Sequence, residues 1–132
     1  MNAALQATDP YYARLLATVQ HNGFLLRTIN RREWTEELRL AAVRSEGRAL
    51  QLISDPSQAV IRAAVEQDGD ALRYVVDQTD EICLVACRQW LSALHHIADD
   101  DMRERVIEGL IDEGVLATHP FNEAANAPAY VG

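Results

Sequence analysis

LAAVRSEGRALQLIS (Leu40–Ser54) and IRAAVEQDGDALRYVV (Ile61–Val76) are two copies of one pattern within a chain of 132 residues. Each copy has alanine five positions and valine four positions before a glycine, and leucine three positions after it. Self-similarity at a fixed period is the sequence signature of a repeat architecture. The pattern therefore predicts an array of repeats.

The same register extends from these two copies toward both ends of the chain. The anchors of the five copies are Gly23, Gly47, Gly69, Leu91 and Gly114. The residues expected to be buried equivalents are Val19, Val43, Val65 and Cys87 before the anchors, and Leu26, Leu50, Leu72 and Leu94 after them. The repeats cover about residues 9–32, 33–54, 55–76, 77–98 and 99–117, and a tail follows at 118–132. A repeat array buries its core only between neighbours, so we expect residues 1–132 to form one domain.

Within each repeat, the spacing of apolar residues predicts two helices. Positions eight and four before the anchor share one helical face, as Ile61 and Val65 do. Apolar residues two or three and six positions after it mark a second, shorter helix. We expect the glycine to end the first helix as a left-handed residue. Helix starts are expected at Asp9-Pro10, Glu33, Asp55-Pro56 and Asp77.

No alternating pattern indicates a strand. The predicted fold class is therefore all-α, with short tandem helix-turn-helix repeats that form a small α-solenoid or a compact helical array. The two quoted stretches resemble a bacterial family of tandem helical repeats of unknown function, with a consensus of roughly L-x-A-V-x-x-x-G-x-A-L-x-x-A. The resemblance covers about residues 10–98. It implies the repeat fold and no catalytic residue.

The fourth copy departs from this pattern at two positions. Leu91 replaces the glycine, and Trp90 precedes it where the other copies have Asn22, Glu46, Asp68 and Glu113. Without the glycine, one helix can continue from about Glu81 to His96. If the break is retained, Trp90 lies in a turn, is partly exposed and becomes a natural binding hot spot. We expect instead that Trp90 packs against the fifth repeat or against Phe121 and Tyr130, because large aromatic side chains are mostly well buried.

Cys83, Cys87, His95 and His96 are the one grouping with metal-ligand residue types. Two thiolates on one helix face could bind a metal. However, both cysteines occupy positions that are apolar in the other copies, where a free cysteine acts as a small hydrophobic residue. We therefore expect core packing, with no metal and no cofactor. Two cysteines this close do not form a disulfide framework, so we expect a reduced, cytoplasmic protein. No apolar run is long enough to cross a membrane.

The charges are distributed unevenly along the chain. All 12 basic residues are arginine, and the formal net charge is −8, which argues against direct binding of nucleic acid. Residues 1–62 hold 8 arginines and 6 acidic residues, whereas residues 63–132 hold 4 arginines and 14 acidic residues. Such asymmetry indicates an interaction surface. The alternative is a solvated edge that only prevents aggregation.

The sequence contains no recognisable catalytic set, so it predicts a non-enzymatic protein-interaction module. We expect it to bind, and to inhibit or scaffold, a protein partner with a basic surface. The candidate partner-binding residues are Trp90, Glu66, Asp68, Asp70, Asp77, Asp80, Glu81, Asp99, Asp100 and Asp101. The alternative is an acidic, DNA-mimicking inhibitor of nucleic-acid-handling machinery, such as an anti-CRISPR-like phage protein or a nuclease-immunity protein. A third possibility is a structural role, in which the end repeats of separate copies stack on one another. The sequence does not determine the oligomeric state.

Overall fold

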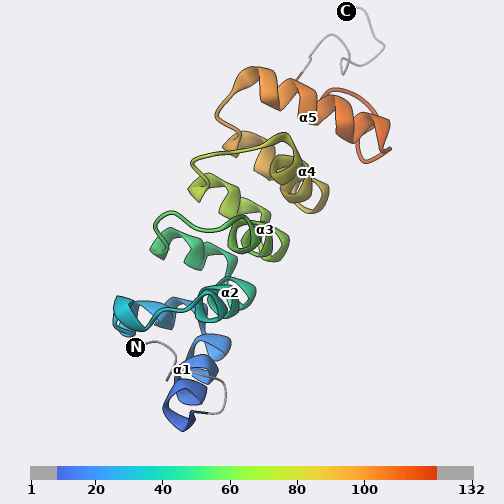
Figure 1. Cartoon of the computed structure of the whole chain (residues 1–132). Helices are drawn as coiled ribbons and strands as arrows, with labels where there is room; N and C mark the ends of the chain where they lie inside the picture. Colours follow the sequence, from blue (N-terminus) through green and yellow to red (C-terminus); the bar gives the residue numbers. More distant parts are fainter. Residues whose placement is uncertain (1–8, 122–132) are drawn as a thin grey trace, which may run out of the picture.

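The computed structural model describes residues 9–121, which form an elongated stack of helices with α1 at one end and α5 at the other (Figure 1). No strand occurs within this range. The α-helices are α1 (Pro10–His21), α2 (Glu36–Ser45), α3 (Gln58–Gln67), α4 (Asp80–Gln89) and α5 (Asp100–Asp112). The 3₁₀ helices are η2 (Gly23–Thr28), η3 (Arg31–Glu33), η4 (Gly47–Leu52), η5 (Gly69–Tyr74) and η6 (Leu91–His96). The prediction of an all-α helix-turn-helix array is confirmed.

The repeats form two layers that run along the stack. Each α-helix packs on the next, from α1 to α5, and the 3₁₀ helices η2, η4, η5 and η6 pack on one another in the same order. Figure 1 shows α2, α3 and α4 on one side of the array and the 3₁₀ helices on the other. Each repeat therefore buries its apolar face against its neighbours.

The predicted core positions are all buried. Val19, Val43, Val65 and Cys87 lie on the inner faces of α1 to α4, and Leu26, Leu50, Leu72 and Leu94 lie on the 3₁₀ helices. None of these side chains is more than 2% exposed. The second helix of each of the first four repeats is a 3₁₀ helix of 6 residues, in which side chains at i and i+3 line up.

The helix starts were predicted correctly in the first repeat and two residues too early in the next three. Asp9 caps α1 by accepting a hydrogen bond from the Tyr11 amide, with Pro10 in the first turn. In place of Glu33, Asp55 and Asp77, the caps of α2, α3 and α4 are the hydroxyls of Thr35, Ser57 and Thr79. Asp55 has a φ of 52°, in the left-handed region, whereas an N-cap residue has extended backbone.

The role predicted for the anchor glycines was wrong for Gly23, Gly47 and Gly69 and correct for Gly114. Among the described residues, Gly114 alone among the glycines has a positive φ (80°), and it ends α5. Gly47 instead starts η4 and lies against the next repeat, where an added Cβ would be 2.5 Å from the carbonyl oxygen of Ala64. Gly69 meets Ala86 in the same way at 2.8 Å. Glycine is therefore needed for close packing between repeats.

The helix break in the fourth repeat is retained, so the continuous helix over 81–96 does not form. α4 ends at Gln89, and Trp90 has extended backbone (φ −137°, ψ 93°), as Glu46 and Asp68 have at the same repeat position. The Trp90 carbonyl accepts a hydrogen bond from the Ala93 amide in the first turn of η6. The extended residue before the anchor makes the break, and it does so without a glycine.

Candidate protein-binding surface

Trp90 and Leu91 form a half-exposed apolar pair at the junction of α4 and η6. Trp90 is 45% exposed and Leu91 is 43% exposed. The predicted burial of Trp90 was wrong, because the side chain is half-exposed and its indole lies against Gly69 of the preceding repeat. The ring of Phe121 lies beside His95 and His119 instead. Tyr130 lies outside the described residues.

The exposure of this pair follows from the repeat geometry. The side chains just before each anchor contact the glycine of the preceding repeat: Glu46 lies against Gly23, Asp68 against Gly47, and Trp90 against Gly69. This position lies at the surface, so the other copies fill it with polar residues. Leu91 stands where glycine meets the following repeat in the other copies. The pair is thus apolar surface at a site where the repeat pattern is polar.

Six of the nine acidic residues predicted to bind a partner form ion pairs with arginine inside the chain, and several of these pairs join neighbouring repeats. Arg48 on η4 binds Asp68 and Asp70 at 3.1 and 3.4 Å. Arg62 on α3 binds Glu66 and Glu81, both at 3.1 Å. Asp80 and Asp100 pair with Arg105 and Arg103. All six carboxylates are partly neutralised; the pairs of Glu66 and Asp100 lie within one helix, and the other four carboxylates link adjacent repeats.

The other three predicted carboxylates differ in their surroundings. Asp99 caps α5 by accepting a hydrogen bond from the Met102 amide. Asp77 and Asp101 are exposed and form no ion pair within residues 9–121. The structure therefore does not bring the ten candidate residues into one cluster. It leaves Trp90 and a few separated carboxylates accessible to a partner.

No protein-family model, curated protein or solved structure matches this chain. The resemblance to a bacterial repeat family accordingly stays a prediction. The repeat itself is present in the structure, since α2–η4, α3–η5 and α4–η6 follow one another with equivalent caps and equivalent buried residues.

The cysteines and histidines do not come together. Cys83 and Cys87 are buried free thiols on α4, as expected for core residues, and burial raises their pKa values to about 11 and about 12. His95 lies beside the Phe121 ring, whereas His96 lies 3.4 Å from Asp70. Across the described part of the chain, no group of three or more metal-ligand side chains is close enough to share an ion.

None of the helices within residues 9–121 has both the length and the apolar character needed to cross a bilayer.

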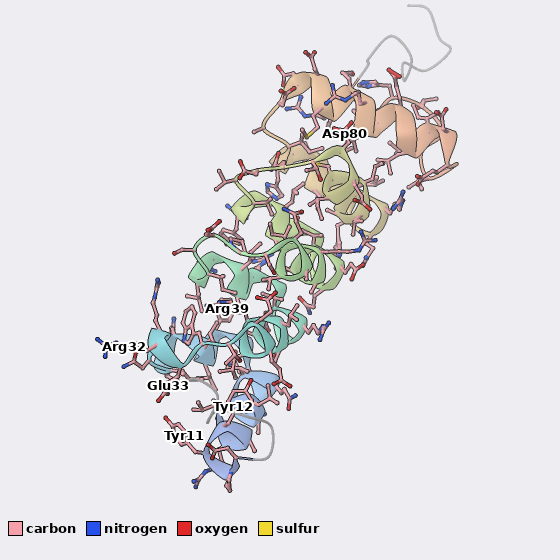
Figure 2. All side chains as sticks on the ribbon, viewed as in Figure 1. Tyr11, Tyr12, Arg32, Glu33, Arg39 and Asp80 are labelled. Carbon is pink, nitrogen blue, oxygen red and sulfur yellow. The ribbon has the colours of Figure 1, made fainter. Side chains whose placement is uncertain are left out.

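The end of the array that contains α1 and α2 carries arginines that form no ion pair. Arg14, Arg27, Arg32 and Arg44 form no ion pair with a described residue, and Arg32 points away from the stack (Figure 2). Glu33 accepts a hydrogen bond from the Tyr11 hydroxyl at 2.9 Å, and Glu37 accepts one from Tyr12 at 2.8 Å. The uneven distribution of charge in the sequence is therefore also a difference between the two ends of the stack.

Sequence reasoning missed one hollow, of about 460 Å³, on the edge where the repeats join. It is lined by the loop between η4 and α3 and by the loop after η5, and its lining includes Pro56, Tyr74 and Val76. Val76 is 94% exposed. The available signal was Pro56 itself, which stands where the neighbouring repeats have Trp34 and Gln78.

The ion pairs between α4 and the fifth repeat make stability depend on pH. Arg105 lowers the pKa of Asp80, and Arg88 lowers the pKa of Glu113 through hydrogen bonds to the carboxylates. A carboxylate whose pKa is lowered by folding stabilises the folded state above its unfolded pKa, and this contribution is lost as pH falls through the folded pKa.

We therefore expect Asp80→Asn and Glu113→Gln to destabilise the protein at about pH 7 and to have little effect at about pH 2, below the usual titration range of carboxylates. Urea unfolding of each variant at several pH values measures this difference. Glu108→Gln on α5 is the control, since it removes the same charge without breaking an ion pair. A wild-type pH dependence in both ion-pair variants would show that these pairs do not stabilise the fold.

Proposed function

We propose that this chain is a non-enzymatic protein-binding module whose partner contacts the Trp90–Leu91 pair. The observation that carries the proposal is the exposure of two adjacent large apolar side chains at a repeat position that is otherwise polar. Tryptophan is enriched among the residues that contribute most to interface energy, especially where surrounding polar groups exclude water. Beside the pair, the Ser92 hydroxyl donates a hydrogen bond to Asp70 at 3.2 Å, so polar groups border the apolar surface and a carboxylate lies next to it, which favours a partner with basic groups.

The rigid stack supports this function because it holds the pair in place. Trp90 rests against Gly69, and the hydrogen bond between the Trp90 amide and the Ala86 carbonyl (2.9 Å) fixes its backbone. A preorganised side chain loses little conformational entropy when a partner binds. Both cysteines are unpaired thiols, which supports placing this binding in the reducing cytoplasm.

The DNA-mimicking alternative receives less support from the structure. A mimic of phosphates needs carboxylates that are free to meet arginine or lysine side chains of the partner. Most of the predicted carboxylates already bind arginines of this chain, through Arg48, Arg62 and Arg105 in particular. A protein-binding module that uses Trp90 and Leu91 does not require a row of unpaired carboxylates.

We expect Trp90→Ala to abolish partner binding without lowering the melting temperature by more than a few degrees. The full chain is immobilised, partners are captured from the native host, and stoichiometric partners are quantified by mass spectrometry for the wild type and the variant. Val115→Ala, which shortens another exposed apolar side chain, is the matched control and should retain the partner.

Two results would refute this proposal. One is equal recovery of the partner by Trp90→Ala, and the other is the absence of any stoichiometric partner. A fall of many degrees in the melting temperature would instead assign Trp90 to packing within the stack.

A further inference from the structure

The side chain of Gln78 fills the space between the successive 3₁₀ helices η5 and η6. Its amide nitrogen donates to the carbonyl oxygens of Leu72 (3.3 Å) and His96 (2.8 Å), and its amide oxygen accepts from the Ala98 amide at 3.0 Å. One carboxamide therefore bridges two repeats through three backbone groups.

The same position one repeat earlier holds Pro56, whose ring has no hydrogen-bond donor or acceptor to offer. Counting back 22 residues from the partners of Gln78 gives the carbonyls of Leu50 and Tyr74 and the amide of Val76. Tyr74, Val76 and Pro56 all line the hollow described above. Neither the Tyr74 carbonyl nor the Val76 amide forms a hydrogen bond with any described residue. The hollow is therefore the junction that lacks its bridging side chain.

The walls of the hollow suit a flexible side chain with a polar, planar end. Ile53 and Ile61 contribute apolar surface at the base, and the ring of Tyr74 is held beneath Arg73, whose guanidinium carbon lies 5.7 Å from the ring centroid. Asp55 and Asp77 line the hollow, and neither forms an ion pair within residues 9–121. The hollow thus combines backbone groups matched to a carboxamide with two carboxylates that favour adjacent positive charge.

We propose that this hollow binds the side chain of a glutamine in an extended, basic segment of a protein partner. The glutamine carboxamide repeats two of the contacts of Gln78 with residues that line the hollow: it donates to the Tyr74 carbonyl and accepts from the Val76 amide. Basic residues beside the glutamine meet Asp55 and Asp77. The inference deepens the proposed binding function by naming a chemical group that the partner presents, and it concerns a surface separate from Trp90.

The test uses a capped pentapeptide, Ala-Arg-Gln-Arg-Ala, and a matched peptide with methionine in place of glutamine. Each is titrated into the ¹⁵N-labelled full chain, and the backbone amide shift of Val76 is followed by NMR. We expect a saturable shift with the glutamine peptide and binding about tenfold weaker with the methionine peptide, because the methionine leaves the backbone groups unpaired. Pro56→Gln is expected to fill the hollow from within, to move the Val76 amide signal in the free protein and to prevent the peptide shift.

Equal binding of the two peptides would overturn the inference, as would a peptide shift that persists in Pro56→Gln. The absence of any shift at Val76 would overturn it as well. The peptide comparison in the wild type stands by itself if Pro56→Gln does not fold. Failure of this experiment leaves the Trp90 proposal intact, because Trp90→Ala is measured with the native partner and does not alter the hollow.

Discussion

Replacing Gly47 with alanine is expected to lower the free energy of unfolding by about 3 kcal/mol, the upper part of the usual range for overpacking. The new Cβ would lie 2.5 Å from the Ala64 carbonyl oxygen and 2.9 Å from the Asp68 Cβ. The carbonyl belongs to the backbone of α3, so the clash is relieved only by moving one repeat away from the next. Urea unfolding followed by circular dichroism measures the change.

Gly109→Ala is the matched control for this glycine. It lies within α5, and its nearest neighbour is the flexible end of the Leu84 side chain at 3.2 Å. Alanine favours a helix interior over glycine by up to about 1 kcal/mol, so this variant is expected to be neutral or more stable. If Gly47→Ala were as stable as Gly109→Ala, the close contact between repeats would not be what requires glycine at the anchor.

Leu72→Ala is expected to cost about 2 to 5 kcal/mol, the range for a leucine truncated in a well-packed core. Leu72 is fully buried on η5, between η4 and η6, so the cavity opens in the middle of the array. Leu91→Ala shortens a leucine of the neighbouring 3₁₀ helix that is half-exposed, and an ordinary surface change costs within about 0.5 kcal/mol. Thermal and urea unfolding of both variants gives the comparison. A loss below 0.5 kcal/mol for Leu72→Ala would mean that the repeat register is wrong.

The sequence predicted the features of the fold that recur once in every repeat. Equivalent side chains such as Val43 and Val65 recur in every repeat because every repeat buries the same face, and that requirement leaves a direct trace in the sequence. The helix breaks near Gly23, Gly47 and Gly69 were placed correctly for the same reason. The cap positions were misplaced because Asp55-Pro56 carries a start signal, while Ser57 two residues later makes the hydrogen bond.

The reason for the anchor glycines could not be read from one repeat. A glycine after a helix is usually explained by left-handed backbone, and the competing reason is a contact with the following repeat. Gly47 meets Ala64, which is 17 residues away in sequence, so the contact exists only once the stack has formed. Leu91 shows the consequence, since it keeps the break without the glycine.

The candidate site was predicted least well, because charge and exposure depend on neighbours that periodicity does not reveal. The acidic residues at the turns look available in the sequence, yet Arg48 and Arg62 bind four of them across or within repeats. Trp90 was expected to be buried from the general tendency of large aromatic residues. Its repeat position, which is polar in the other copies, was the better guide.

Fluorescence of Trp90 in a Trp34→Phe variant reports whether a partner covers this side chain, because that variant leaves one tryptophan in the chain. Acrylamide quenching is measured with the variant alone and then with its captured partner bound. Trp90 is expected to be readily quenched in the free protein and protected in the complex. A tryptophan that is shielded before the partner binds, or that is quenched equally in the complex, would contradict it.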